Sequence, residues 1–164
     1  MITLLTPRDI DEILALQYIC FANNDLFIPT SREGYLRAFR FQNFCLGYRE
    51  TLDSPLTAFL NCSIPTERSQ CNWGRGRLPD GLLNAVGHIN TLLIQVGRRR
   101  RGLGRDMVDA ALARFSREKC SHIYATVSPD NRASLKLLNS FGFSVVDTIW
   151  LHGQQRHLVY GQFS

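Results

Sequence analysis

The most constraining feature of the sequence is an apolar strand, a glycine-containing turn and a strongly periodic helix that directly follow one another. Residues 88–96 are rich in Ile, Leu and Val, as expected of a buried strand. After this strand, small or apolar side chains recur at helical spacing at Gly104, Met107, Val108, Ala111, Leu112 and Phe115. The free amides and the dipole at the start of such a helix favour an anion, and glycine lets the anion approach the backbone. The segment therefore predicts a phosphate-binding turn.

The remaining elements predict a single domain of the mixed α/β class. Further strands are expected at residues 2–5, 43–49, 56–64, 122–127, 143–149 and 156–163. Helices are expected to begin at Thr6-Pro7 and to cover residues 31–39, 82–85 and 131–141. A chain of 164 residues that is 45% hydrophobic suits one domain spanning residues 1–164. Segment 65–87 is long and polar, and such segments tend to be functional or mobile.

Hydropathy and cysteine spacing exclude several classes of protein. No run approaches the roughly 20 apolar residues that a membrane span requires. The first residues do not resemble a signal peptide, so we expect a cytoplasmic protein without a membrane partner. The five cysteines are odd in number and include no Cys-x-x-Cys pair. They predict reduced, mostly buried thiols, and neither a disulfide framework nor a metal site.

The positive charge is concentrated on arginines around the glycine turn. The net charge is +5, and Lys119 and Lys136 are the only lysines. The arginines that precede or begin the predicted helix are Arg98, Arg99, Arg100, Arg101 and Arg105. A planar guanidinium fits phosphate through two parallel donors. The cluster therefore fits a small phosphorylated ligand, while a nucleic-acid patch and an ordinary solvated surface remain open.

The glycine turn departs from two common nucleotide-binding patterns and resembles a third. Met107 occupies the third glycine position of the dinucleotide fingerprint, and no Gly-Lys-Ser/Thr follows as in a P-loop. Arg99-x-x-Gly102-x-Gly104 instead resembles the Arg/Gln-x-x-Gly-x-Gly/Ala motif of the GCN5-related N-acetyltransferase (GNAT) superfamily. A second segment is also similar to that family, namely Asn131-x-x-Ser134-x-x-Leu137-Leu138 followed by Phe141-Gly142-Phe143. The detailed resemblance covers about residues 88–146.

The resemblance implies both a fold and a cosubstrate. The implied fold is a mixed, mostly antiparallel central sheet of six to seven strands flanked by helices. The implied cosubstrate is acetyl-CoA, whose pyrophosphate the loop amides would hold. The residues implied to bind it are Ile94, Gln95, Val96, Arg99, Arg100, Arg101, Gly102, Leu103, Gly104, Arg105, Asn131 and Ser134. An amide at 94–96 would stabilise the oxyanion, and Asn131 would bind the pantetheine arm, cap its helix, or do both.

Two positions bear on the catalytic residues. His88 lies where several family members carry a glutamate, and Gly87-His88-Ile89-Asn90 resembles the arylalkylamine N-acetyltransferase branch. Because residues 88 and 90 share one strand face, the resemblance implies His88 as a candidate general base and Asn90 as a second candidate. A purely structural His88 is the alternative. Leu138 stands where the family usually places a tyrosine acid, so the thiolate would leave unprotonated or be protonated by another group.

The expected function is an acetyl-CoA-dependent N-acetyltransferase that acts by direct attack of a small-molecule or protein amine. The alternatives are an inactive acyl-CoA-binding regulatory module, which the absent family acids favour, and an enzyme for an RNA-linked amine. The resemblance implies that the acceptor is set by residues 21–41 and 65–87. Their aromatic residues line a pocket or belong to the core, namely Phe27, Tyr35, Phe39, Phe41 and Trp73. The sequence carries no signal for an oligomeric state.

Overall fold

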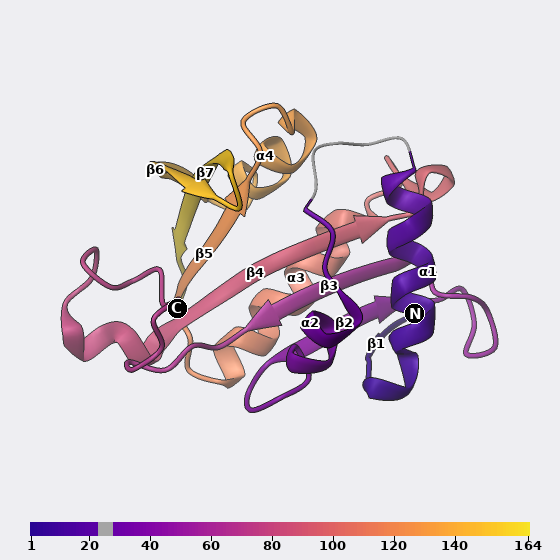
Figure 1. Ribbon diagram of the computed structural model, residues 1–164, viewed down its shortest axis with the longest axis horizontal. Helices are drawn as coiled ribbons and strands as arrows, with labels where there is room; N and C mark the ends of the chain where they lie inside the picture. Colours follow the sequence, from indigo (N-terminus) through magenta and orange to yellow (C-terminus); the bar gives the residue numbers. More distant parts are fainter. Residues whose placement is uncertain (23–27) are drawn as a thin grey trace. The chain divides into compact units, whose positions relative to one another are not determined.

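The sheet of the computed structural model, which describes residues 1–22 and 28–164, contains seven strands. The strands are β1 (Ile2–Leu4), β2 (Phe44–Tyr48), β3 (Ala58–Ser63), β4 (Val86–Ile94), β5 (His122–Val127), β6 (Ser144–Leu151) and β7 (Gln154–Gln162). Their order is β1-β2-β3-β4-β5-β7-β6 (Figure 1). The pair β4–β5 is parallel, and the pairs β1–β2, β2–β3, β5–β7 and β6–β7 are antiparallel. The predicted mixed, mostly antiparallel sheet is thereby confirmed.

Helices connect these strands, and their bounds differ slightly from the prediction. The α-helices are α1 (Ile10–Phe21), α2 (Arg32–Arg37), α3 (Leu103–Arg117) and α4 (Arg132–Asn139), and the 3₁₀ helices are η1 (Pro7–Asp9), η2 (Asp80–Ala85) and η3 (Val96–Arg98). Strand β4 ends earlier than predicted because η3 turns the chain out of the sheet. Its bonds run from the Arg98 amide to the Gln95 carbonyl at 2.8 Å and from the Arg99 amide to the Val96 carbonyl at 3.2 Å.

The start of the first helical segment follows from local sequence. The Thr6 hydroxyl accepts from the Arg8 amide at 3.3 Å, and the Asp9 carboxylate accepts from the Thr6 amide at 2.8 Å. Pro7, which has no amide hydrogen to satisfy, occupies the first helical position. This reciprocal capping confirms the predicted helix start, which forms η1 before α1 begins.

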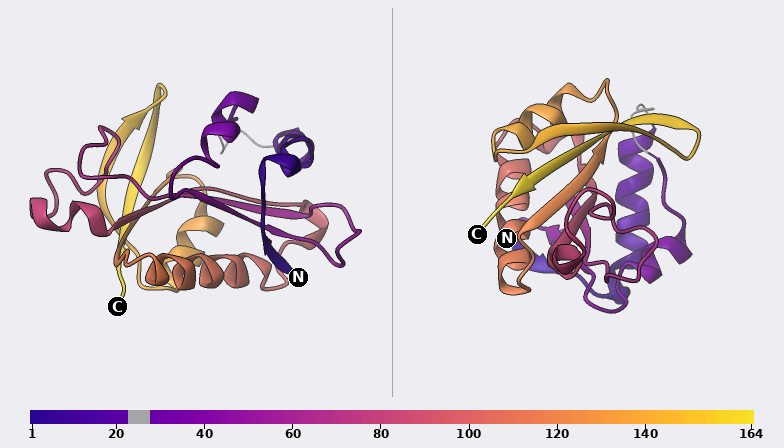
Figure 2. Two further views of the ribbon diagram at one scale, coloured as in Figure 1. Left: turned by 90° about the horizontal axis from the view of Figure 1, so that it is seen from below. Right: turned by 90° about the vertical axis from the view of Figure 1, so that its left-hand side faces the viewer.

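The described chain forms two compact units, and the first comprises Met1–Ser63 and Asn90–Leu112. Helices α1 and α2 lie on one face of strands β2 and β3 (Figure 2). Ile13, Tyr35 and Phe59 are fully buried in the core between them. The rings of Tyr35 and Phe59 meet edge to face at 5.4 Å, so this aromatic pair belongs to the core of the unit.

The second unit comprises Ile64–Ile89 and Ala113–Ser164, so β4 and α3 each contribute to both units. Phe115 of α3 packs against Gly87 of β4, where a Cβ would lie 2.5 Å from its ring. The neighbouring side chain, His88, therefore points to the opposite face of β4. A buried cluster of Val86, Tyr124 and Leu158 is packed by Trp73, Leu78 and Tyr160. The organisation as one domain of residues 1–164 stays a prediction.

Candidate functional site

The turn between β4 and α3 lies in the first unit and carries the predicted phosphate-binding residues. Gly102 has a φ of 80°, and no atom lies within 4 Å of the position that a Cβ would take. Its carbonyl accepts from the Asp106 amide at 3.0 Å, within the first turn of α3. The turn therefore presents backbone without side-chain cover at the start of a long helix, as anion binding requires.

Arg98 and Arg99 hold this turn through their side chains. Arg98 forms an ion pair with Glu50. The Nε of Arg99 donates to the Ile94 carbonyl at 3.0 Å, so its side chain folds back onto the end of β4. The thiol of Cys20 donates to the same carbonyl at 3.6 Å, and burial raises the pKa of this thiol. The Ile94 carbonyl is thus fixed by two donors.

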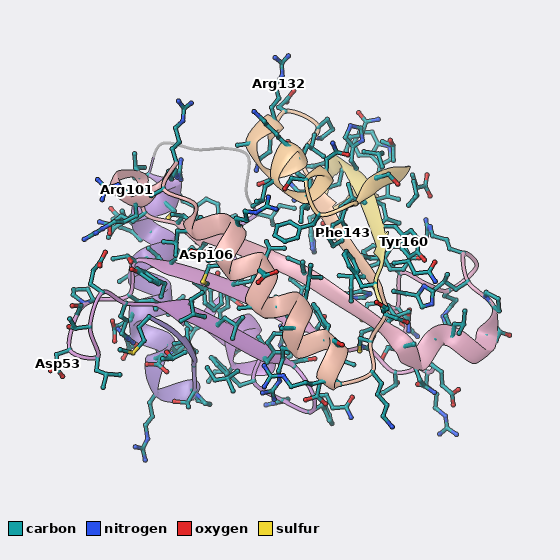
Figure 3. All side chains as sticks on the ribbon, turned by 180° about the vertical axis from the view of Figure 1, so that it is seen from behind. Asp53, Arg101, Asp106, Arg132, Phe143 and Tyr160 are labelled. Atoms are coloured by element: carbon teal, nitrogen blue, oxygen red, sulfur yellow. The ribbon has the colours of Figure 1, made fainter. Side chains whose placement is uncertain are left out.

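Three other arginines lie beside the turn. Arg100, Arg101 and Arg105 are exposed, and Arg100 has a φ of 61°. Figure 3 shows Arg101 in the turn and Asp106 in the first turn of α3. Guanidinium groups next to a helix start add donors and charge to the free amides. The first unit therefore brings the predicted residues 94–105 together, and their binding of a diphosphate stays a prediction.

The amides at the end of β4 are the predicted oxyanion donors. The Gln95 amide donates to the Thr57 carbonyl at 2.9 Å, which ties the strand end to β3. This bond uses the hydrogen of Gln95, so the candidate donors narrow to the amides of Ile94 and Val96. The side chain of Val96 is 64% exposed, so the backbone here lies near the surface of the unit.

Asn131 and Ser134 lie together at the start of α4 in the second unit. The Asn131 Oδ1 accepts from the Ser134 amide at 3.2 Å, as an N-cap does. The capping role is confirmed. Leu138 is 6% exposed and belongs to the core, where it cannot donate a proton.

His88 lies in the second unit and forms one hydrogen bond to the backbone of Trp73. Its Nε2 accepts from the Trp73 amide at 3.3 Å, and the two rings lie 6.2 Å apart. The side chain is 3% exposed, and burial lowers the pKa of His88 to about 3. The ring is therefore neutral at physiological pH, with its only unprotonated nitrogen in contact with the segment between β3 and β4.

Asn90 follows on the same face of β4 but within the first unit. It is exposed, and its Nδ2 donates to the Ser63 hydroxyl at 3.1 Å. An amide carries no titrating group, so Asn90 in this position can bind and orient a ligand rather than accept a proton.

Asn72 organises the segment that contacts His88, and sequence reasoning missed it. This side chain is 3% exposed, and its Nδ2 donates to the carbonyls of Thr66 and Leu83 at 3.1 and 2.9 Å. Its Oδ1 accepts from the Gly74 amide at 2.9 Å. The pattern Asn72-x-Gly74 is a signal for this local turn, because an Asn side chain bonds to the backbone two residues on.

Arg77 ties the same segment to β6, another contact that sequence reasoning missed. Its guanidinium donates to the Trp73 carbonyl at 3.2 Å and pairs with Asp147 at 2.6 Å. The bond to Arg77 lowers the pKa of the Asp147 carboxyl. A register shift of β6 between Val145 and Asp147 sets the position of this carboxylate. Local sequence carries no signal for a pair that depends on such a bulge.

The predicted aromatic candidates separate in the structure. Tyr35 belongs to the core of the first unit, and Phe39 is partly buried against it. Phe41 is 97% exposed, and Phe27 lies outside the described residues. Trp73 is partly buried, and its ring lies near the ring of His88. Of the described aromatic candidates, it is the one that lies beside a predicted site residue.

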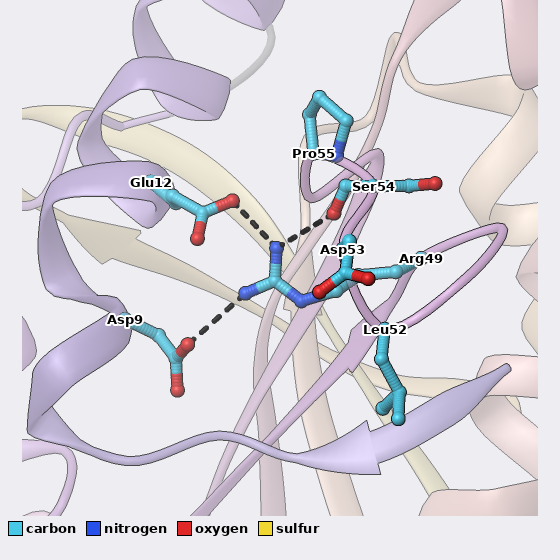
Figure 4. A pocket seen from close by; sticks show the side chains of 7 residues that line it. All are labelled: Asp9, Glu12, Arg49, Leu52, Asp53, Ser54 and Pro55. Atoms are coloured by element: carbon cyan, nitrogen blue, oxygen red, sulfur yellow. Dashed lines mark hydrogen bonds and ion pairs between the residues drawn. The ribbon is translucent and has the colours of Figure 1, made fainter.

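A polar pocket in the first unit is lined by Asp9, Glu12, Arg49, Leu52, Asp53, Ser54 and Pro55 (Figure 4). The Arg49 guanidinium bonds to Asp9 at 3.0 Å and to Glu12 at 2.5 Å. Glu12 also accepts from the Leu56 amide at 3.1 Å. The charged groups of Asp9, Glu12 and Arg49 therefore pair with one another, and their bonds join the start of α1 to the loop after β2.

Within residues 1–22 and 28–164, no group of His, Cys, Asp and Glu side chains could hold a metal ion. No helix in these ranges is long and apolar enough to cross a membrane. The cysteines are free thiols, and Cys71 is the exposed one.

Comparison with known proteins adds the family. Residues 17–143 match the model of the Acetyltransferase (GNAT) family. A GNAT-family acetyltransferase from Streptococcus pneumoniae has a similar structure, with a TM-score of 0.75 and 15% identity over 100% of this chain and 99% of that chain. The ribosomal-protein-S18-alanine N-acetyltransferase from Escherichia coli gives a TM-score of 0.72, 13% identity and coverages of 98% and 90%.

A third similar structure is yncA from Salmonella typhimurium, solved with its cofactor acetyl-CoA, with a TM-score of 0.73, 15% identity and coverages of 100% and 94%. No curated protein matches the sequence. At these identities the structures show the shared fold, and the family match spans well over half of the chain. The chain therefore belongs to the GNAT family of acetyltransferases.

Proposed function

We propose that this protein is an N-acetyltransferase that moves the acetyl group of acetyl-CoA to an amine. The observation that carries the proposal is the uncovered turn at Gly102, which directly precedes α3 and lies among exposed arginines. Family membership and the neighbour solved with acetyl-CoA support the identity of the anion. The similar structure named as a ribosomal-protein-S18-alanine N-acetyltransferase supports an amine acceptor.

The proposed roles of the residues follow from their contacts. The amides at the start of α3 bind the diphosphate, with Arg100, Arg101 and Arg105 adding charge. The amide of Ile94 or Val96 donates to the carbonyl oxygen as negative charge develops on it.

Acetyl-CoA supplies a thioester, whose C–S bond breaks as the amine nitrogen bonds to the carbonyl carbon. The proton lost by the amine goes to water, and the thiolate, with an ordinary thiol pKa of about 8.5, leaves without an acid at Leu138.

The test is calorimetric titration of the intact protein with acetyl-CoA, followed by turnover with a panel of amines. We expect binding heat and a raised melting temperature, since a ligand of the native state stabilises it. Gly104→Val should remove both by blocking approach to the backbone, whereas Gly81→Val, at an exposed site with no atom within 4 Å of its Cβ position, should retain them. No binding by the intact protein would contradict the proposal.

A catalytically inactive acyl-CoA-binding module is the second candidate, because Leu138 replaces the usual acid. Binding without turnover on every amine would favour it. The remaining candidate, an RNA-linked acceptor, predicts RNA affinity that falls steeply with salt. A flat salt dependence would exclude this acceptor and leave small-molecule and protein amines.

A further inference from the structure

His88 occupies a position at which a general base is expected, yet in the second unit it is buried and bonded to the backbone of Trp73. Gly87 faces Phe115 and Ile123, so His88 faces the other side of β4, where the segment between β3 and β4 lies. The titratable side chain beside it on β5 is its register neighbour Tyr124. Burial raises the pKa of Tyr124, and the nearby charge of Arg77 lowers it by a smaller amount.

The direction of the hydrogen bond restricts what the ring can do. A backbone amide can only donate, so Nε2 of His88 accepts from Trp73 and carries no proton. The neutral ring then carries its proton on Nδ1. Neither nitrogen is left to take a proton from an amine, because protonation at Nε2 would bring two donors face to face. The low pKa of His88, about 3, agrees with this geometry.

The backbone of Trp73, whose amide bonds to His88, has further contacts. The Trp73 carbonyl accepts from Arg77, and Arg77 pairs with Asp147. Asn72, the residue before Trp73, closes the segment upon itself through three bonds. One backbone unit, that of Trp73, is therefore fixed through its amide by β4 and through its carbonyl by Arg77.

We infer that His88 is a positioning residue, which fixes Trp73 and with it the segment of residues 64–85 that meets the acceptor amine. This inference rests on the proposed function, which supplies the acceptor amine. In this role His88 acts through Trp73 and affects how tightly the amine binds, and it does not remove the proton of the amine.

The experiment compares His88→Gln, whose amide oxygen can still accept from Trp73, with His88→Leu, which cannot accept at all. His157→Gln, on β7, is the matched control. We expect His88→Gln to keep kcat, KM and the pH profile of the wild type. His88→Leu should keep kcat and raise the KM for the amine about tenfold, as expected when a buried donor loses its partner.

A readout independent of activity comes from tryptophan fluorescence. Trp73 and Trp150 are the only tryptophans, and Trp150 is 75% exposed, so Trp150→Phe leaves Trp73 as the sole reporter. In that background, acrylamide should quench Trp73 more strongly in His88→Leu than with His88 or Gln present. Nitrogen-15 NMR of the unmutated protein should show an unprotonated Nε2 and no His88 titration between about pH 5 and 9.

Three results would overturn the inference. One is a loss of kcat by about 10²-fold in His88→Gln, the size expected for removal of a general base. Another is unchanged KM and unchanged quenching in His88→Leu. The last is a His88 ring that titrates near neutral pH, which decides the matter even if His88→Leu does not fold. Absence of turnover in the unmutated protein would refute the proposed function alone, because quenching and NMR still report on His88.

Discussion

Gly87→Ala is expected to destabilise the protein through the face of β4 opposite His88. The new Cβ would lie 2.5 Å from one ring carbon of Phe115, 2.6 Å from a second, and 2.9 Å from the Ile123 side chain. The nearest ring carbon must retreat from 2.5 to about 3.4 Å to reach ordinary contact, and Phe115 is only 1% exposed. The ring therefore has no solvent to retreat into.

Overpacking of this kind costs about 1–3 kcal/mol. The smaller backbone entropy of alanine in the unfolded chain returns about 0.4–1 kcal/mol, which leaves a net loss between about 0 and 2.6 kcal/mol, or about 1.3 kcal/mol at the midpoints of both ranges. At about 2–4 °C per kcal/mol for a chain of this size, the midpoint loss should lower the melting temperature by about 3–5 °C.

The assay is thermal unfolding followed by circular dichroism, with Gly81→Ala as the control. Gly81 is exposed, and no atom lies within 4 Å of its Cβ position, so its melting temperature should not fall. Phe115→Leu combined with Gly87→Ala should lose less stability than the sum of the single changes, by about 0.5 kcal/mol or more. Equal melting temperatures for Gly87→Ala and Gly81→Ala would refute the packing argument.

Three other contacts give predictions. Arg99→Ala should weaken acetyl-CoA binding about 2- to 10-fold in calorimetry, the range for one lost hydrogen bond, and unchanged affinity would show that the turn keeps its shape without this bond. Asp147→Asn should speed proteolysis of segment 64–85, and the charge exchange Arg77→Asp with Asp147→Arg should slow it again if the pair is what fastens the segment. Arg49 lowers the pKa of Glu12, so the stability from this pair is complete above the ordinary pKa of 4.5 and is lost as pH falls through the lower folded value. Melting curves of Arg49→Met should therefore lack this part of the acid-induced loss.

The fold and the turn before α3 could be predicted because their signals are local. The helical repeat at Met107, Val108 and Ala111 and the pattern Arg99-x-x-Gly102-x-Gly104 each lie within one short stretch. Element bounds were less accurate. Strand β4 ends at Ile94 because the backbone bonds of η3 turn the chain out of the sheet, although the apolar run continues to Val96. Local periodicity reports which face of a strand is buried and not where the strand ends.

The contacts that fasten segment 64–85 could not be predicted, because they join distant parts of the chain. Arg77 and Asp147 are 70 residues apart, and a bulge in β6 sets the position of the carboxylate. Both are ordinary surface residue types in the sequence. Asn72 is different, because its turn with Gly74 is local, and attention to Asn-x-Gly patterns in a long loop would have identified it.

His88 shows why a residue type at a familiar position does not determine a chemical role. The strand pattern predicts which face the ring occupies, but the role depends on which nitrogen keeps a lone pair accessible. Here that lone pair is taken by the backbone amide of Trp73, and every residue except proline offers such an amide. The residue type at position 73 therefore cannot predict this contact between a backbone amide and His88. The same imidazole would be a credible base if the segment packed elsewhere, so the covering backbone, rather than the histidine, decides between anchoring and proton transfer.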